Sequence, residues 1–359
     1  MSVEPLRIAQ VAPLWTAVPP AGYGGAELMV SWLTEALVRQ GHEVTLFASG
    51  ESVTTAKLHP IHDVCLIAAM ERGTANQYEA YAVSAITNAV AQSCSFDVIH
   101  SHVGPLGIPF SRLSPIPVVH TVHQGLDGVD EQWLLRQYPE AFIASISDSQ
   151  VAEIPEQRRQ KITTIYHGCD FGAYEFGGAA GEYLAFVSRM GKNKNPAGAI
   201  RIAKEVGMTI VLAGIPQDPS EAQYFDREVR PLIDGSGVTY LGEISQQEKV
   251  RLLRDAAALL FPIRWEEHFG IAMIEAMACG TPVVANRRGS VPEVVDFGIT
   301  GFYSSDESEL ANLVRRAIGL DRRTVYEHAK RRFSHDRMVG NYLRLYHIVI
   351  AQQGRLKLR

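Results

Sequence analysis

Two runs of alternating strand and helix patterns, separated by a glycine-rich break, constrain the fold of this chain most strongly. The first run opens with an apolar strand, a helix and a second strand at 7–13, 27–39 and 42–48. A strand, helix, strand order of this length predicts a parallel sheet whose loops meet at one edge. The segment 171–181 holds four glycines and no periodicity, and the alternation restarts after it. We therefore predict two doubly wound α/β domains, 1–170 and 171–335.

The same periodicities predict the remaining elements. In the first domain we expect a helix at 76–92, strands at 96–100, 116–123, 141–145 and 161–166, and a helix from about Ser149. In the second domain we expect strands at 183–188, 209–213, 238–241, 257–261 and 282–285, and helices at 196–206, 219–232, 245–254, 270–279 and 306–333. The segments expected to be loops are 13–25, 51–75 and 102–115. The last segment, 336–359, has a helical apolar face and either completes the second domain or crosses back onto the first.

Composition and charge exclude several classes of protein. At 359 residues, with 46% hydrophobic and 20% charged residues, the chain has the size and composition of a two-domain globular protein. A net charge of −5 argues against a nucleic-acid partner, which needs a concentrated basic surface. The four cysteines show no CxxC spacing, so we expect a reduced cytoplasmic protein without a disulfide framework. We expect no signal region and no transmembrane segment. Arg355, Lys357 and Arg359 form a small cluster that could touch an anionic membrane surface weakly.

The apolar run 264–280 contains two carboxylates, Glu267 and Glu275, eight positions apart. Gly270 predicts that a helix begins there, which leaves Glu267 at the helix mouth and Glu275 one to two turns inside. A buried carboxylate needs a hydrogen-bonding partner because its desolvation is costly. The partners are either the hydroxyl groups of a polyol such as a ribose or hexose, or a structural Arg or Lys for Glu275, with Glu267 then a solvated loop charge.

Two loops carry features that suit an anion. Gly24 and Gly25 stand where the first loop enters the first helix, a place where backbone N–H groups can approach a phosphate, although no G-x-G-x-x-G motif occurs there. In the second domain, Arg189, Lys192 and Lys194 lie together just before a helix start. Cations repel the positive end of a helix dipole, so this cluster makes sense mainly if an anion binds there. A flexible loop and a solvated basic turn are the alternatives.

Four histidines are predicted to gather at the loop edge of the first sheet because each stands at a strand end: His100, His102, His120 and His123. Their spacings give no helical i,i+4 pair and no HExxH motif, so we do not expect a metal site. At least two of them are expected to be packing residues. His123 is followed by Gln124-Gly125 and is the best candidate for contact with a substrate.

Taken together, these stretches resemble the retaining glycosyltransferases of the two-domain GT-B fold, in particular glycosyltransferase family 4. The resemblance rests on Tyr23-Gly-Gly-Ala-Glu27, Val119-His-Thr-Val-His-Gln-Gly125, Ile165-Tyr-His-Gly-Cys-Asp170, Ser188-Arg-Met-Gly-Lys-Asn-Lys194 and the Glu267…Glu275 pair. It implies two Rossmann-like domains facing a central cleft, the first on the acceptor side and the second binding a nucleotide-sugar donor. Two departures stand out: His167 replaces a common asparagine, and Arg287-Arg288-Gly289-Ser290 replaces a turn of small residues, so that extra positive charge could reach the cleft or the acceptor.

The resemblance also implies roles for individual residues. Arg189 and Lys194 would neutralise the diphosphate, Glu275 would accept from the ribose hydroxyls, Glu267 would contact the transferred sugar, and His123 would lie near that sugar. The residues implied to bind the donor are Gly24, Gly25, Arg189, Lys194, Glu267, Phe269, Gly270, Ile271 and Glu275. The residues implied to take part in catalysis are His123, Glu267, Arg189 and Lys194.

The implied reaction is transfer of a hexosyl group, most commonly from a UDP-sugar such as UDP-glucose, to a hydroxyl acceptor. In this family, same-face attack retains the anomeric configuration without a covalent intermediate, and the leaving phosphate helps to deprotonate the acceptor. No cofactor and no metal are expected, since the two cations neutralise the leaving group. A nucleotide-sugar epimerase of the same architecture and a non-catalytic nucleotide-sugar-binding protein are the alternatives.

Overall fold

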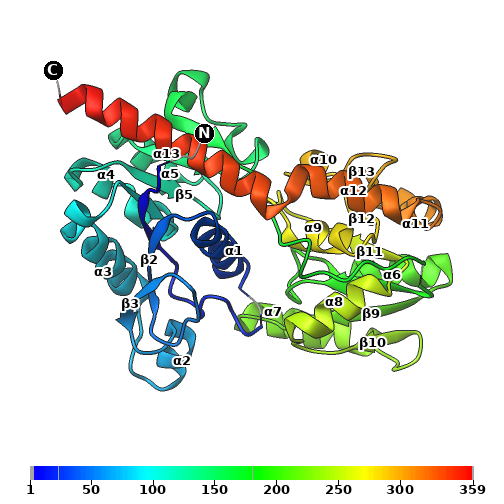
Figure 1. Cartoon of the computed structure of the whole chain (residues 1–359). Coiled ribbons are helices and arrows are strands. Elements are labelled where there is room, and N and C mark those ends of the chain that lie inside the picture. The colour runs from blue at the N-terminus through cyan, green and yellow to red at the C-terminus, as the bar shows by residue number, and fades with distance from the viewer. Residues whose placement is uncertain (1–3, 23, 180, 358–359) are drawn as a thin grey trace. The chain divides into compact units, whose positions relative to one another are not determined.

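The computed structural model describes residues 4–22, 24–179 and 181–357, and the chain divides into two compact units. Unit 1 comprises 1–168 together with 335–359, and unit 2 comprises 169–334 (Figure 1). Tyr23 and Arg359 lie outside the described residues, and the side chains of Arg355 and Lys357 are not described either. The basic cluster at the C-terminus therefore stays a prediction.

Unit 1 is built around a seven-stranded parallel sheet. Its strands are β1 (Arg7–Val11), β2 (Glu43–Ser49), β3 (Lys57–His62), β4 (Val98–Ser101), β5 (Val118–Thr121), β6 (Phe142–Ser145) and β7 (Ile162–Thr164). Its helices are α1 (Gly25–Arg39), α2 (Leu66–Glu71), α3 (Tyr78–Ala91), α4 (Phe110–Leu113), α5 (Val129–Gln137) and α13 (His335–Lys357), with 3-10 turns at Ser93–Ser95, Gly104–Gly107, Ser149–Val151 and Glu156–Lys161. The strand order is β3-β2-β1-β4-β5-β6-β7, so the direction of winding switches between β1 and β4.

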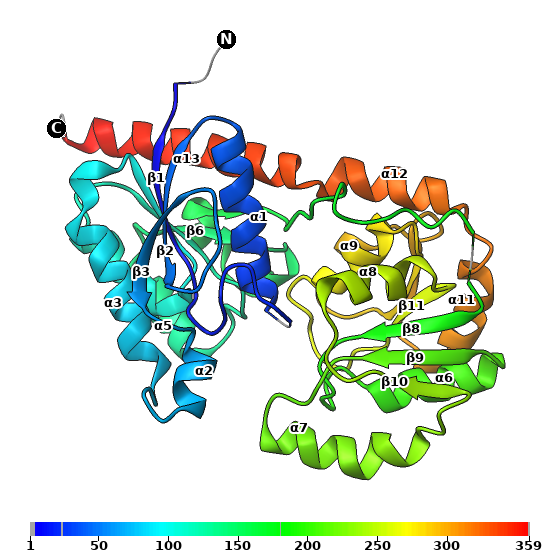
Figure 2. The ribbon, with the colours of Figure 1, turned by 60° about the horizontal axis from the view of Figure 1, so that its bottom comes forward.

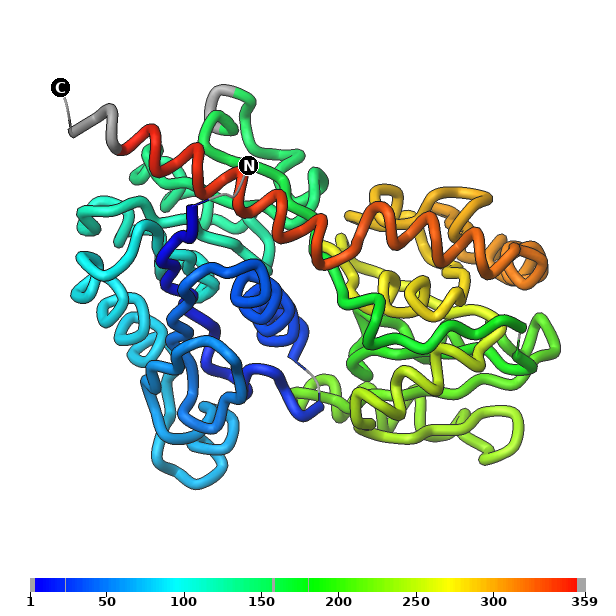
Figure 3. The backbone as a smooth tube through the Cα atoms, viewed as in Figure 1, coloured from blue at the N-terminus to red at the C-terminus, as the bar shows by residue number. Residues whose placement is uncertain are grey.

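The two faces of this sheet are covered by different helices because successive strand residues point to opposite sides. Ile8 of β1 packs in a core with α1 and α13, whereas Ala9 packs in a second core with α3. α13 lies alongside α1, and its Tyr342 and Tyr346 are fully buried there (Figure 2). The first and last segments of the chain thus belong to one core, as the blue and red ends of the tube in Figure 3 illustrate.

Unit 2 contains a six-stranded parallel sheet of the same kind. Its strands are β8 (Tyr183–Val187), β9 (Thr209–Ala213), β10 (Val238–Tyr240), β11 (Ala258–Phe261), β12 (Val283–Asn286) and β13 (Gly301–Ser304). Its helices are α6 (Pro196–Val206), α7 (Pro219–Tyr224), α8 (Gln246–Arg254), α9 (Ile271–Ala278), α10 (Val291–Val294), α11 (Leu310–Ala317) and α12 (Arg322–Phe333). A π-turn at Phe225–Val229 and 3-10 turns at Arg230–Leu232 and Glu307–Glu309 complete it. The order β10-β9-β8-β11-β12-β13 switches between β8 and β11.

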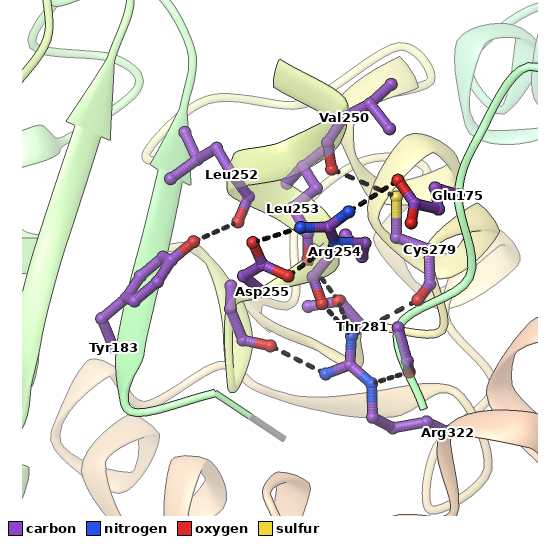
Figure 4. A network of polar contacts seen from close by, with 12 residues as sticks. Glu175, Tyr183, Val250, Leu252, Leu253, Arg254, Asp255, Cys279, Thr281 and Arg322 are labelled. Carbon is purple, nitrogen blue, oxygen red and sulfur yellow. Dashed lines mark hydrogen bonds and ion pairs between the residues drawn. The ribbon is translucent and has the colours of Figure 1, made fainter. Parts of the chain in front are cut away.

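A buried arginine, Arg322, joins several segments of unit 2 by hydrogen bonds. The Arg322 guanidinium donates to the carbonyl oxygens of Gly177 at 2.6 Å, Ala256 at 2.7 Å and Arg254 at 2.7 Å (Figure 4). It also donates to the Thr281 hydroxyl at 2.6 Å. These acceptors lie at the C-terminal end of α8, after α9 and in the segment 171–181, so one cation caps helix ends and fastens that segment to unit 2.

Several elements differ from the sequence predictions. The expected loop 51–75 contains β3 and α2, and the expected helix from Ser149 is a pair of short 3-10 turns. The single helix expected over 306–333 is wrong: α11 and α12 are separate, because the Asp321 side chain accepts from the Thr324 N–H and starts α12 anew. In the described part of the chain, no helix is long and apolar enough to cross a membrane.

Candidate functional site

The switch point of each sheet gathers the residues that the sequence analysis singled out. In an open α/β sheet, ligands bind beside the carboxyl ends of strands where the winding direction reverses. In unit 2 these ends lead into the basic turn after β8 and into the loop that carries Glu267 after β11. In unit 1 the end of β4 leads into His102, which lies among buried histidines from neighbouring strand ends, and the end of β1 leads into the loop before α1.

The basic turn of unit 2 is held rigidly by its own backbone and by Asn195. Asn195 adopts a left-handed conformation, with φ of 59°, and its side chain accepts from the Gly198 N–H at 3.1 Å to cap α6. The same amide donates to the Pro262 carbonyl oxygen at 2.9 Å, which ties the turn after β8 to the loop after β11. Lys194 and Glu267 therefore face each other from two connected loops.

Both implied phosphate ligands of this turn already have carboxylate partners. Arg189 Nη1 lies 2.6 Å from Glu221 Oε1 at the start of α7. A Cβ at Gly191 would lie 2.5 Å from the same oxygen, so a side chain there would have to displace the Glu221 carboxylate. Lys192 is exposed. Glu221 and Glu267 supply anions to two of the three cations, so the cluster does not by itself require an external anion. Binding of a ligand anion by this turn stays a prediction.

Lys194 and Glu267 form a buried ion pair. Lys194 Nζ lies 2.5 Å from Glu267 Oε2, and each residue is only 7% exposed. Trp265 Nε1 donates to the same oxygen at 3.2 Å, and the ammonium lies 4.5 Å from the Trp265 ring centroid. The alternative that Glu267 is a solvated loop charge is wrong. Glu266 next to it is the solvated one, with a side chain 66% exposed beside Arg288.

The helix after Glu267 begins where the sequence predicted. Gly270 is the N-cap of α9 with φ of +77°, a conformation that strongly favours glycine, and a Cβ there would lie 2.6 Å from Met273 Cε. The N-cap of α9 makes no side-chain hydrogen bond, and the Met273 N–H donates to the Gly270 carbonyl oxygen at 2.9 Å. The backbone of Ile271 and Ala272 at the helix start is therefore where a ligand anion would bind. Phe269 is buried and packs edge-on against Phe333.

Glu275 lies on α9, 3% exposed, within a polar cluster of unit 2. The Tyr174 hydroxyl donates to Glu275 Oε1 at 2.6 Å, and Lys249 Nζ lies 2.6 Å from the same atom. Gln246 Nε2 donates to the Tyr174 oxygen at 2.8 Å. Burial, and after it the carboxylate, raise the pKa of Tyr174 well above its usual value, so the phenol remains a donor. Glu275 thus has the structural lysine partner that the sequence analysis left open.

A cavity of about 400 Å³ lies at the ends of β11, β12 and β13, and the arginine pair Arg287-Arg288 is part of its lining. Arg264, which also lines it, is paired with Glu307 at 3.0 Å. Gly289 brings this turn against the Glu267 loop: its φ is +51° and a Cβ would lie 2.1 Å from the Glu267 carbonyl oxygen. The turn that carries Arg287 and Arg288 and the loop that carries Glu267 therefore pack directly against each other.

In unit 1, the structure explains Gly24 by packing within the chain. A Cβ at Gly24 would lie 2.8 Å from Pro20 Cβ and 2.8 Å from Thr16 Oγ1. Gly25 is the first residue of α1. Glu27 is buried in the first turn of that helix and accepts from the Thr16 N–H at 3.4 Å. Burial raises the pKa of Glu27.

The histidines of unit 1 form a chain of hydrogen bonds rather than a loose cluster. His123 Nε2 lies 3.1 Å from His102 Nδ1, and His123 Nδ1 lies 3.4 Å from His167 Nε2. His102 Nε2 in turn lies 2.9 Å from Gln10 Oε1 on β1. His120 is not in this chain and pairs with the Ser111 hydroxyl at 2.7 Å. Both ring nitrogens of His123 are therefore engaged inside unit 1.

These imidazoles are neutral at physiological pH. Burial lowers the pKa of His123 to about 4 and that of His120 to about 3. Burial also lowers the pKa values of His100, His102 and His167 well below the ordinary range, with further lowering from neighbouring histidines. Among the described residues no group of three or more His, Cys, Asp or Glu side chains is arranged to hold a metal ion.

Sequence reasoning missed the partners that complete both sites: Gln10, Tyr174, Glu221, Lys249, Tyr342 and Tyr346. Lys194 and Glu267 are 73 positions apart, and His100 and Tyr346 are 246 apart. Periodicity reports which face of an element is buried and cannot report which distant polar groups meet there. The one available signal was the polar Gln10 within an apolar strand.

Comparison with known proteins matches each part of the chain to a glycosyltransferase family. Residues 23–172 match the family described as Glycosyltransferase Family 4, and residues 179–332 match the family described as Glycosyl transferases group 1. D-inositol 3-phosphate glycosyltransferase of Mycolicibacterium smegmatis is 26% identical over 325 residues, which are 77% of this chain and 74% of that protein. The protein of the same name from Mycobacterium bovis is 27% identical over 348 residues, 83% of this chain and 72% of its own length.

Solved structures share the fold over nearly the whole chain. AviGT4, a glycosyltransferase involved in avilamycin A biosynthesis, is 25% identical with a TM-score of 0.73, covering 97% of this chain and 98% of its own. A sucrose-phosphate synthase from Thermosynechococcus elongatus is 20% identical with a TM-score of 0.74, covering 97% and 100%. The two parallel sheets are therefore those of the GT-B fold.

Proposed function

This chain belongs to the group 1 glycosyl transferases of glycosyltransferase family 4, and we propose that it transfers a hexosyl group from a UDP-sugar, such as UDP-glucose, to a hydroxyl acceptor with retention of configuration. Dependence on a nucleotide sugar follows from the family, whereas the sugar, the base and the acceptor are part of the proposal. The observation that carries it is the buried Lys194–Glu267 pair at the mouth of α9.

In this proposal unit 2 holds the donor. The diphosphate lies against the uncapped first turn of α9, from Gly270 to Ile271, and draws Lys194 and Arg189 away from their carboxylate partners. A diphosphate carries more charge than one carboxylate, so the exchange is favourable for two cations that are already fixed in place. Glu267, released from Lys194, turns its carboxylate to the hydroxyl groups of the transferred sugar.

The other predicted residues take separate parts of the ligand. Glu275 accepts from the ribose hydroxyls, in exchange for or beside its Tyr174 and Lys249 contacts. The backbone from Phe269 to Ile271 borders the sugar, and Gly24 and Gly25 of unit 1 approach the diphosphate. His123 of unit 1 contacts the sugar, and unit 1 receives the acceptor.

The proposed chemistry follows from charge. The bond between the anomeric carbon and the diphosphate oxygen breaks, and negative charge grows on that oxygen beside Arg189, Lys194 and the α9 N–H groups. The acceptor oxygen forms the new bond to the anomeric carbon on the same face. Its proton passes to the departing phosphate oxygen, so no protein base and no covalent intermediate are required. Because two cations neutralise the leaving group, we expect turnover to persist in a metal chelator.

The test is to incubate the purified chain with UDP-glucose and other nucleotide sugars and to measure released nucleoside diphosphate, with and without a chelator. A transferase releases it, at least through slow hydrolysis of the donor, whereas an epimerase changes the sugar without release and a binding protein does neither. Lys194→Met should abolish release, and Lys192→Met is the matched control because its side chain is exposed on the same turn. Loss of release in both variants, or in neither, would contradict the assigned role of Lys194.

A further inference from the structure

The hydrogen-bond chain that runs from His167 through His123 to His102 continues through Gln10 of β1 to the terminal helix α13. Gln10 lies at its centre: its Oε1 faces His102 Nε2 at 2.9 Å, and its Nε2 donates to the Tyr346 hydroxyl at 3.2 Å. Beyond Tyr346 the chain passes to His100 Nδ1 at 2.7 Å. His100 Nε2 lies 2.7 Å from the Thr121 hydroxyl, which in turn lies 2.9 Å from the Tyr342 hydroxyl. Gln10 and these last residues are fully buried or nearly so.

Every link in this chain depends on the link before it. A neutral imidazole has one N–H donor and one acceptor nitrogen, so a bond at one nitrogen dictates what the other can do. Hydroxyl groups can reverse their direction by rotating. An amide reverses only when the whole group turns over through 180°, because its oxygen only accepts and its nitrogen only donates. The orientation of Gln10, with Oε1 toward His102 and Nε2 toward Tyr346, therefore sets the direction of the chain.

The direction can be followed from Gln10 to His123. Gln10 Oε1 accepts, so His102 carries its proton on Nε2 and its Nδ1 is an acceptor. His123 must then donate from Nε2, which leaves its Nδ1 without a proton. His167 then donates from its Nε2 to this Nδ1 at 3.4 Å, which is the longest hydrogen bond of the chain. With the opposite amide orientation, every one of these imidazoles would carry its proton on Nδ1 instead.

We propose that Gln10 and His102 are positioning residues that hold His123 in the tautomer with its proton on Nε2 and so make Nδ1 a hydrogen-bond acceptor. The ligand group that suits Nδ1 is a hydroxyl, which displaces the long contact with His167 and donates its proton to the ring nitrogen. A group that only accepts, such as a phosphate oxygen or a fluorine, does not suit it. This last step rests on the proposed contact of His123 with the donor sugar, whereas the tautomer does not.

Long-range ¹H–¹⁵N correlation spectra of the full chain, labelled with ¹⁵N only in its twelve histidines, test the tautomer directly. The two nitrogens of a neutral imidazole have separate signals, one typical of a protonated and one of an unprotonated nitrogen. The His123 set is identified by its loss in His123→Gln. We expect Nδ1 of His123 to be unprotonated in the ligand-free protein, and the opposite tautomer would overturn the proposal whatever the activity.

Variants at position 10 separate direction from packing. Gln10→Met keeps the length of the side chain and removes both polar atoms, so the His123 signals should move toward a mixture of tautomers. Gln10→Glu, whose ionised carboxylate still accepts from His102, should restore the parental pattern. Ser111→Ala is the matched control, because it removes the partner of a buried histidine outside the chain. Unchanged His123 signals in Gln10→Met, or the same change in Ser111→Ala, would refute the role of Gln10. Nucleoside diphosphate release by these variants tests the proposed function separately.

Discussion

The two units place opposite kinds of polar group at equivalent points of the same sheet architecture. At the switch point of unit 2, buried or partly buried side chains of opposite charge meet in pairs, and both members of the Lys194–Glu267 pair are buried. At the switch point of unit 1, the buried groups are neutral imidazoles, hydroxyls and one amide. The comparison teaches that the fold fixes where a ligand can bind, while the side chains at the strand ends decide which part of it each unit can recognise.

The difference has a physical basis. Burying a charge without a partner costs desolvation free energy, so in the absence of ligand a buried cation needs an anion beside it. A ligand of higher negative charge can then replace that anion. A neutral chain of hydrogen bonds avoids this cost but couples the direction of each bond to the next. In the proposed function, the cations of unit 2 therefore take the diphosphate, and the neutral histidine chain of unit 1 takes only an uncharged group.

The largest effect is expected from breaking the buried pair of unit 2 on one side. Among the described residues, Lys194→Met leaves the buried Glu267 carboxylate with the Trp265 indole as its remaining partner, which should lower the free energy of unfolding by about 3–5 kcal/mol. Lys194→Met combined with Glu267→Met should recover most of that loss, because no unpaired charge remains. Chemical denaturation of the two variants measures this, and equal losses in both would show that the pair is not what holds the site.

The second effect concerns pH and belongs to unit 1. His123 has a pKa of about 4 in the folded chain, below its ordinary value of 6.5, so below pH 6.5 the unfolded chain binds a proton that the folded chain does not. Stability is therefore lost as pH falls from about 6.5 to about 4, at up to about 1.4 kcal/mol per pH unit for each such histidine. His123→Asn should reduce this slope relative to the parent and leave the region above pH 7 flat. Equal slopes for parent and variant between pH 6 and 5 would contradict a His123 that stays neutral in the folded chain.

The smallest effect sharpens the contrast between enclosed and exposed pairs within unit 2. Glu266 and Arg288 form an ion pair in which both side chains are more than half exposed, at 66% and 55%. Glu266→Gln should change the free energy of unfolding by less than about 1 kcal/mol, since water screens the pair. Glu267→Gln at the adjacent position is the natural comparison. A larger loss for the exposed pair than for the enclosed one would reverse this account of unit 2.

Much of the architecture could be predicted because apolar strands and glycine breaks leave a local signal. The elements that were missed lack one. β3 contains Pro60 but lies at the edge of its sheet, where a proline is tolerated. α5 buries only Leu135, so its apolar periodicity is nearly absent. β13 is four residues long and begins at Gly301, whose missing Cβ lets it lie against the Val283 backbone.

The candidate site was predictable only as a set of residues, not as a set of partners. The motif around Glu267 and Gly270 fixed the start of α9 correctly, because a left-handed glycine and an apolar helix are local features. The pairing of Lys194 with Glu267, and of Glu275 with Lys249, depends on loops that fold together across the sheet. The same holds for His123, whose surroundings come from β1, β4 and the loop after β7.

We claim that the side-chain cations of unit 2, and not the histidines of unit 1, provide most of the affinity for the nucleoside diphosphate. Calorimetric titration of the full chain with UDP tests it most directly, using Arg189→Met for unit 2 and His123→Ala for unit 1, after both variants have been shown to melt like the parent. Arg189→Met should weaken UDP binding by about 1.5–3 kcal/mol, the size of a lost contact to a charged group, and His123→Ala should leave it nearly unchanged. Unchanged affinity in Arg189→Met together with a clear loss in His123→Ala would contradict the claim.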